Sequence, residues 1–312
     1  MAGDHAAAVA GVLARDRLAV ARAITRVEND PRAAAAIIGG VFSRSGRAML
    51  VGVTGSPGVG KSSLVDRMAA VWRRRGRTVG VLAVDPSSPF SGGAVLGDRV
   101  RMQTHASDEG VFVRSMATRG HLGGLARATG DAAVILDAAG YDVVVIETVG
   151  VGQAEVEVSR TADVTILVTM PGTGDGVQAL KAGVMEIADL FVVNKADLDG
   201  AGRAVTEIET MLGLRDDPEG AWRPPVLQTC ATRGDGVEAA LDAVDRCRAY
   251  DPDRASSRRR ARVAAWMRQL LAHRVVTVAT DLGVLDEAVD QVVGGERDPY
   301  AAAETLVARL LR

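Results

Sequence analysis

Cysteine and long apolar runs are scarce in this sequence of 312 residues, and both scarcities exclude classes of protein. The two cysteines, Cys230 and Cys247, lack metal-ligand spacing, and we interpret them as reduced thiols of a cytoplasmic protein. No window approaches about 18 uninterrupted apolar residues, which argues against a membrane-spanning helix. The apolar run 6–14 follows Asp4 rather than a basic segment, so we expect no signal peptide. The formal net charge of −2 predicts no general attraction to nucleic acid or membrane.

Lysine is also rare. Of the 37 basic residues, only Lys61, Lys181 and Lys195 are lysines, and the others are arginines. Lysine carries a compact point charge, whereas arginine carries a planar fork of donors. A lysine retained against this bias is therefore a candidate for a site that needs a compact cation.

Apolar, β-branched runs alternate with amphipathic ones through the middle of the chain. Strands are expected at 48–54, 78–85, 111–114, 141–148, 164–170, 189–194 and 225–229. Because these runs are nearly apolar on both faces and helical patterns separate them, we predict an α/β fold with a mostly parallel sheet covered by helices on both faces. The expected division is a helical extension over 1–46, broken at Asp30-Pro31, a central domain over 47–250, and a helical segment over 251–312.

The stretch GSPGVGKS, residues 55–62, has the pattern of a phosphate-binding loop and lies between a predicted strand and a predicted helix. Glycines let the backbone curl around phosphate, so that N–H groups and the helix N-terminus face the anion. Lys61 is expected to bridge the β- and γ-phosphates, and the Ser62 hydroxyl to ligate Mg²⁺. The predicted nucleotide ligands here are Gly55, Ser56, Gly58, Val59, Gly60, Lys61, Ser62 and Ser63.

The tetrapeptide NKAD, residues 194–197, follows a predicted strand and favours GTP over ATP. The Asp197 carboxylate can accept hydrogen bonds from N1–H and the 2-amino group of guanine, a donor pair that adenine lacks. Lys195 is expected to pack along the base, and Asn194 to tie this loop to the phosphate loop. The next strand ends in a loop whose Cys230, Ala231 and Thr232 are expected to close over the base edge through backbone N–H groups.

Three carboxylates are candidates for the magnesium side of the site. Glu147 ends an apolar strand three residues before Gly150, a pattern typical of a metal-linked acid followed by a loop that senses the γ-phosphate. The glutamate side chain is longer than that of the usual aspartate. This favours a role through a metal-bound water, or in orienting the attacking water, over direct coordination of the metal. Asp85 at a strand end and Asp98 in a glycine-rich loop are the other two. The predicted catalytic set is Lys61, Glu147 and Asp98.

The spacing of these motifs indicates the signal-recognition-particle-like class of phosphate-loop GTPases. A strand ending in Asp85 follows the first helix directly, and the interval from Ser62 to Glu147 is long. Gly150 is followed by valine rather than by a water-orienting glutamine, and Gln153 lies close by without an assigned role. We therefore expect slow intrinsic hydrolysis that a partner accelerates.

Four ordered segments carry a more specific resemblance: GSPGVGKSSL, AVDPSSPFSGGAVLGDRVRM, ETVGVGQAEVEV and GTGDGVQALKAGVMEIADLFVVNKADLDG. Together they resemble the methylmalonyl-CoA mutase-associated GTPases, also labelled arginine/ornithine transport-system kinases. The resemblance implies a homodimeric chaperone that gates cofactor loading of an adenosylcobalamin-dependent acyl-CoA mutase, with a cobalamin adenosyltransferase as a further partner. It also implies that 251–312 is a dimerisation arm.

The family's switches map onto loops of this chain. The switch residues that the resemblance implies are Gly150, Gln153, Asp175, Gln178 and Lys181. The third switch, 172–181, departs from the family, since the chain reads GDGVQALKAG where many members carry an acidic residue before a LQGIK run.

Two other functions stay open at this stage. A true kinase would need an acceptor site, and a nickel metallochaperone would need cysteine or histidine ligands near the switches. The basic run 254–262 is interpreted as a solvated helix start, with contact to a CoA phosphate or an acidic partner as the alternative.

Overall fold

The computed structural model describes residues 2–85, 105, 107–117, 124–148, 158, 161–172, 188–216, 218, 220–250 and 252–310. The chain divides into two compact units, residues 1–260 and 261–312. Within the described part of the chain, no helix is both long and apolar enough to cross a bilayer.

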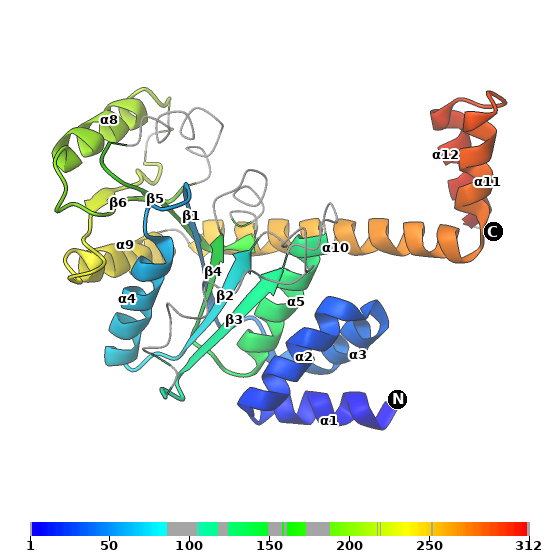
Figure 1. Ribbon diagram of the computed structural model, residues 1–312, viewed down its shortest axis with the longest axis horizontal. Coiled ribbons are helices and arrows are strands. Elements are labelled where there is room, and N and C mark those ends of the chain that lie inside the picture. Colours follow the sequence, from blue (N-terminus) through cyan, green and yellow to red (C-terminus); the bar gives the residue numbers. More distant parts are fainter. Residues whose placement is uncertain are drawn as a thin grey trace. The chain divides into compact units, whose positions relative to one another are not determined.

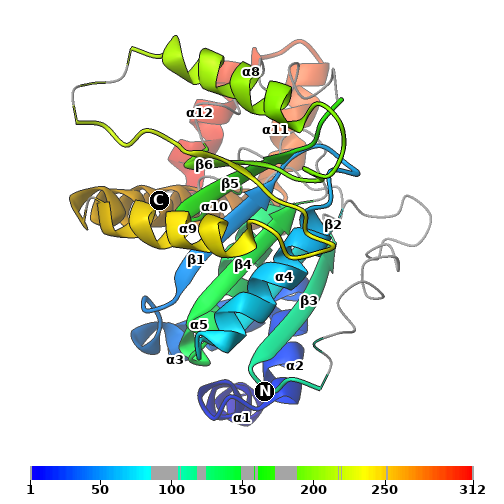
Figure 2. The same cartoon turned by 90° about the vertical axis from the view of Figure 1, so that its left-hand side faces the viewer.

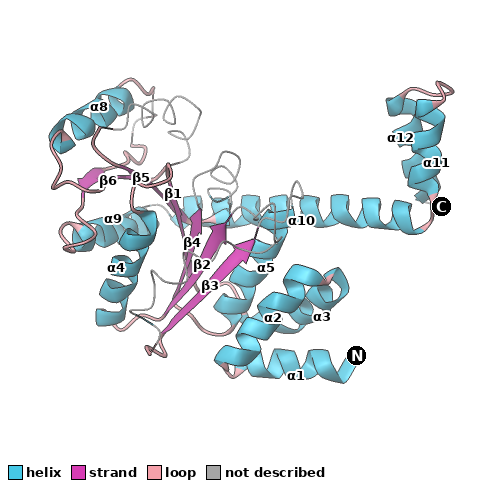
Figure 3. Ribbon diagram, in the orientation of Figure 1, coloured by secondary structure: helices cyan, strands magenta, loops and turns pink. Residues whose placement is uncertain are grey.

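The first unit is built on a parallel sheet of seven strands in the order β3-β2-β4-β1-β5-β6-β7. The strands are β1 Met49–Thr54, β2 Val79–Asp85, β3 Val111–Ala117, β4 Val143–Thr148, β5 Val164–Thr169, β6 Leu190–Val193 and β7 Val226–Gln228. The strands β1 and β4 are buried at every residue, as two-sided coverage requires. Figure 3 shows the arrowheads of β2, β3 and β4 at one end of the sheet. The predicted parallel α/β fold is therefore confirmed.

Helices cover both faces of this sheet. They are α1 Ala2–Leu13, α2 Arg17–Asn29, α3 Pro31–Val41, η1 Phe42–Arg44, α4 Lys61–Arg74, α5 Gly124–Ala138, α8 Ala201–Gly213 and α9 Val237–Tyr250. One hydrophobic cluster joins α4 and α9 to the sheet, and a second joins α1, α2, α3 and α5 to its other face. Figure 1 shows these two groups of helices on opposite sides of the strands, and Figure 2 shows α4 and α9 together on the near side.

The N-terminal extension holds one helix more than the sequence pattern suggested. The expected break at Asp30-Pro31 is present, since the Asp30 carboxylate caps α3. A second break lies at Arg15, whose φ of 58° ends α1, and Asp16 then caps α2 by accepting the Ala19 N–H at 2.6 Å. The Arg15 guanidinium stacks 4.4 Å from the ring centroid of Tyr141, which ties this turn to the central domain.

The start of α10, Pro252–Asp281, is anchored to the sheet by a buried ion pair. The Asp189 side chain is 1% exposed, and its carboxylate accepts hydrogen bonds from both Nη atoms of Arg258, at 2.6 and 2.8 Å. Although burial opposes its charge, the hydrogen bonds with Asp189 keep the pKa of Arg258 above its ordinary value. The basic run therefore includes a structural residue and is not wholly a solvated helix start.

Breaking this pair is expected to destabilise the first unit. Arg258→Met leaves the Asp189 carboxylate buried without its cation, and we expect a loss of about 3 kcal/mol in the free energy of unfolding. Urea unfolding followed by circular dichroism measures it, with Arg260→Met, at an exposed arginine of the same helix, as the control. Equal stability of the two variants would contradict the anchoring role.

The second unit contains the remainder of α10 with α11 Val284–Val293 and α12 Pro299–Leu310. Gly283, at φ 70°, forms the left-handed turn between α10 and α11. An ion pair of 2.6 Å between Arg309 and Glu287 joins α12 to α11. Several large apolar side chains of this unit are exposed, namely Met267, Leu270, Leu271, Val275, Val276, Leu282, Val289, Val293, Tyr300 and Val307.

Candidate nucleotide-binding site

The glycine-rich loop lies where the sequence predicted it, between the carboxyl end of β1 and the first turn of α4. Gly55, Gly58 and Gly60 have φ values of 140°, 79° and 93°, which favour glycine. A Cβ on Gly55 would lie 2.0 Å from the Val168 carbonyl oxygen, and one on Gly60 would lie 2.4 Å from Asn194 Nδ2. The backbone conformation therefore favours glycine at all three positions, and close neighbours also exclude a side chain at Gly55 and Gly60.

Lys61 closes this loop on itself. Its ammonium group donates to the carbonyl oxygens of Gly55 at 2.7 Å and Ser56 at 3.0 Å, and the residue is 6% exposed. The cation therefore lies at the mouth of the loop, beside the first turn of α4. A compact ammonium with three donors suits this position, where an arginine fork would need more room.

Ser62 and Glu147 meet at the carboxyl end of the sheet. The Ser62 hydroxyl donates to Glu147 Oε1 at 2.5 Å, and Glu147 is 4% exposed at the end of β4. The two are brought together because β1 and β4 are neighbours with Val53 opposite Glu147. A hydroxyl and a carboxylate next to a phosphate loop form a donor set that suits Mg²⁺.

The remaining predicted metal and switch residues are placed only in part. Asp85 is the last residue of β2, so its backbone lies at the same edge of the sheet, two positions beyond the residue that pairs with Glu147. Within the described ranges, no group of three or more His, Cys, Asp and Glu side chains is placed to hold a metal ion. The residues that lie outside those ranges are Asp98, Gly150, Gln153, Asp175, Gln178 and Lys181.

The NKAD segment joins the phosphate loop through two side chains. Asn194, which is 2% exposed, donates from Nδ2 to the Val59 carbonyl oxygen at 2.9 Å. Lys195 adopts φ 57° and donates to the Gly58 carbonyl oxygen at 2.8 Å. The expected tie between the two loops is therefore present, and it involves the lysine as well as the asparagine.

Asp197 is exposed and adjoins the loop that follows β7. Its pKa is lowered chiefly by a hydrogen bond from the Cys230 side chain. The carboxylate is ionised at neutral pH, as an exposed aspartate ordinarily is. An ionised carboxylate can accept both hydrogen bonds that the guanine edge offers. Cys230 is therefore placed to position the acceptor.

The loop after β7 is held by bonds that the sequence did not reveal. The Cys230 N–H donates to the Asp235 carbonyl oxygen at 3.0 Å, and the Ala231 N–H donates to Asn194 Oδ1 at 3.1 Å. Of the three N–H groups expected over the base edge, only that of Thr232 forms no hydrogen bond with the described residues.

Arg67 is a residue that sequence reasoning missed. From α4 its guanidinium donates to the carbonyl oxygens of Ala231 and Thr232, both at 3.0 Å. It therefore links the helix that follows the phosphate loop to the loop beside Asp197. In a chain with so many arginines, nothing in the sequence distinguishes this one.

A strand, a glycine-rich loop and a helix with Lys61 at its start define a phosphate-loop nucleotide-binding protein. The comparisons with known proteins agree, because the family model described as "Methylmalonyl Co-A mutase-associated GTPase MeaB" matches residues 20–282. The chain belongs to this family, and it is a GTPase.

Individual relatives support this assignment. A Pyrococcus abyssi protein named as a GTPase is 46% identical over 303 residues, covering 95% of this chain and 94% of its own. The "Methylmalonic aciduria type A homolog, mitochondrial" of Caenorhabditis elegans is 42% identical over 192 residues, which cover 60% of this chain and 48% of that protein. A solved structure titled as a LAO/AO transport system kinase has a TM-score of 0.73 and 26% identity, and the match covers 99% and 98% of the two chains.

Proposed function

We propose that this GTPase is a chaperone for an adenosylcobalamin-dependent acyl-CoA mutase, methylmalonyl-CoA mutase or a close relative. It gates loading of the cobalamin cofactor, protects the mutase from inactivation, and uses GTP hydrolysis for timing. Membership of a family described as mutase-associated carries the proposal, and the name of the Caenorhabditis elegans relative supports it. A cobalamin adenosyltransferase is the second partner, and the cytoplasm is the proposed location.

In this proposal the phosphate loop and NKAD hold the two ends of the nucleotide. Lys61 contacts the β- and γ-phosphates, and Asp197 contacts the guanine edge. The bond from Asn194 to Val59 supports this division, since it fixes the distance between the two ends. The proposed further ligands are Gly55, Ser56, Gly58, Val59, Gly60, Ser62, Ser63, Asn194, Lys195, Cys230, Ala231 and Thr232.

Mg²⁺ is the proposed metal, and it would supply charge neutralisation between the β- and γ-phosphates. The hydrogen bond from the Ser62 hydroxyl to Glu147 supports this. While the hydroxyl donates to Glu147, its oxygen can face the cation. Asp85 and Asp98 are the proposed additional carboxylates, and Asp98, with Lys61 and Glu147, completes the proposed catalytic set.

The proposed contacts with the mutase are the switch residues that the family resemblance implies. In the sequence Gly150 and Gln153 follow shortly after β4, the strand that carries Glu147, as expected of a loop that senses the γ-phosphate. The third-switch residues are Asp175, Gln178 and Lys181. Hydrolysis is proposed to be slow in the isolated chain and faster on the mutase.

The proposed organisation is a helical extension over 1–46, a GTPase domain over 47–250 and a dimerisation arm over 251–312. Exposed apolar side chains of the second unit, among them Leu271, Val276 and Leu282, support a homodimer. Covering such side chains with a second copy removes apolar area from water.

Addition of the client mutase is expected to raise the rate of GTP hydrolysis by the full chain. The measurement compares phosphate release with and without purified methylmalonyl-CoA mutase, and then follows mutase inactivation during turnover with and without the GTPase. Lys61→Ala, which is expected to hydrolyse GTP poorly, serves as the control. With this variant the mutase should not stimulate GTP hydrolysis, and the mutase should not be protected from inactivation. A rate and an inactivation profile unchanged across the mutases of the host cell would contradict the proposal.

A second candidate function is transfer of phosphate to an acceptor, because the solved structure with TM-score 0.73 is titled a kinase. Radiolabelled GTP distinguishes the two. Label recovered only in free phosphate supports hydrolysis, whereas label on a protein or small molecule supports the kinase.

A further inference from the structure

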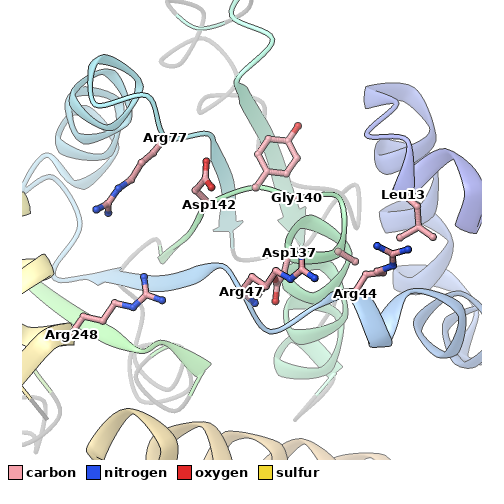
Figure 4. A pocket seen from close by; sticks show the side chains of 10 residues that line it. Leu13, Arg44, Arg47, Arg77, Asp137, Gly140, Asp142 and Arg248 are labelled. Atoms are coloured by element: carbon pink, nitrogen blue, oxygen red, sulfur yellow. Dashed lines mark hydrogen bonds between the residues drawn. The ribbon is translucent and has the colours of Figure 1, made fainter. Parts of the chain in front are cut away.

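A cavity of about 580 Å³ lies at the amino-terminal edge of the sheet, the end opposite to the phosphate loop. Arg47 comes two residues before β1, Arg77 two residues before β2, and Asp142 directly before β4. Arg44 of η1 and Arg248 of α9 complete the charged part of its wall. Figure 4 shows Arg47 in the middle of the lining side chains, with Arg44 on one side and Arg77 and Arg248 on the other.

Among the described residues, three of these four guanidinium groups have no ion pair or side-chain hydrogen bond. Arg77 donates to Asp245 at 2.9 Å, but Arg44, Arg47 and Arg248 form no ion pair or side-chain hydrogen bond with any residue that the structure describes. Each guanidinium carries five N–H donors in a planar fork. The wall therefore presents many charged donors to whatever enters the cavity.

The two carboxylates of the wall already accept hydrogen bonds from backbone N–H groups, and one of them also accepts a bond from a hydroxyl. Asp137 accepts the N–H groups of Gly46, Arg47 and Ala48, the last at 2.9 Å. Asp142 Oδ2 accepts the N–H of Thr78 at 2.7 Å and its hydroxyl at 2.8 Å. These acids fix the strand ends, and neither forms an ion pair with Arg44, Arg47 or Arg248.

A further arginine comes from the basic run at the start of α10. Gly46 has φ 97°, and a Cβ added there would lie 2.3 Å from Nη2 of Arg259. The Arg259 guanidinium therefore lies against the backbone between Arg44 and Arg47. Arginines from four separate segments thus approach one edge of the sheet.

We propose that this cavity binds a small molecule bearing two or more phosphate groups. Guanidinium forks match phosphate oxygens in pairs, and several such groups around one cavity suit several phosphates. The volume falls within the range of small-molecule pockets, and Leu13, Ala138 and Tyr141 add apolar wall for a nonpolar portion. This site is separate from the phosphate loop and does not depend on the mutase proposal.

The test is titration calorimetry of the full chain, with GDP and Mg²⁺ saturating the phosphate loop. Inorganic tripolyphosphate and coenzyme A are the probes, and polyglutamate is the comparison anion. We expect both phosphate probes to bind, and the double variant Arg44→Gln/Arg248→Gln to weaken binding by about a hundredfold because two charged donors are lost. Tighter binding of coenzyme A would assign a nucleotide-like ligand, and tighter binding of tripolyphosphate a purely inorganic one.

The matched control is Arg22→Gln/Arg246→Gln, which removes the same charge at exposed positions outside the cavity. This control should change affinity less than twofold, and thermal unfolding should show that both double variants are folded. Equal weakening in the two double variants would show unspecific charge attraction and overturn the proposal. Absence of phosphate-probe binding, or polyglutamate binding alone, would also overturn it.

Discussion

Lys61→Ala is expected to lower kcat for GTP hydrolysis by about 10²–10³-fold, because a preorganised charge next to the transferred phosphate is removed. The position of Lys61 makes the effect specific. Its ammonium group is buried at the mouth of the loop and bonds to the Gly55 and Ser56 carbonyl oxygens, so the loop is shaped around this cation. Phosphate release in single-turnover and steady-state assays measures the loss.

Lys61→Arg and Arg74→Ala are the informative comparisons. Lys61→Arg keeps the charge but brings a longer planar group into a space in which lysine is 6% exposed, so we expect little recovery. Arg74 lies at the other end of the same helix in an exposed pair with Glu238, and its removal should leave hydrolysis unchanged. Wild-type turnover by folded Lys61→Ala would show that the loop does not act on the triphosphate.

The fold could be predicted from the sequence where apolar runs are continuous. The strands β1 and β4 are buried at every residue, and both were found to within two residues at each end. The strand β3 extends to Ala117, beyond the predicted 111–114, because polar Arg114 and Ser115 lie in an edge strand. Arg114 there bonds to Glu28 of α2 at 2.9 Å, a contact that no local pattern contains.

The site could be predicted where its chemistry is local and not where it depends on tertiary contacts. The phosphate loop and NKAD are short motifs, and the structure brings them together through Asn194 and Lys195. Arg67 gave no signal, because its partners are 164 and 165 residues away. The arginines of the opposite edge were equally hidden, since they come from segments that the sheet brings together.

Asp197→Asn is expected to remove most of the discrimination for guanine, roughly 10⁴-fold, because the substituted amide cannot accept both donors of the base edge. The amide can instead donate to the 2-oxo group of xanthine, so xanthosine nucleotides should gain affinity. In the wild type, a hydrogen bond from the Cys230 side chain lowers the pKa of the Asp197 carboxylate further below its ordinary value. Fluorescent-nucleotide displacement by GDP, XDP and ADP measures the change.

Asp199→Asn is the matched control, since Asp199 is an exposed acid two residues further along the same turn. It loses the same charge but lies outside NKAD, and its preference for GDP over XDP should remain that of the wild type. Because Lys61 and Asp197 act on opposite ends of one nucleotide, Asp197→Asn should still hydrolyse XTP, whereas Lys61→Ala should keep the preference for GTP and hydrolyse it with the lowered kcat. Unaltered GDP preference in Asp197→Asn would mean that other groups read the base, with the Thr232 N–H as the next donor to examine.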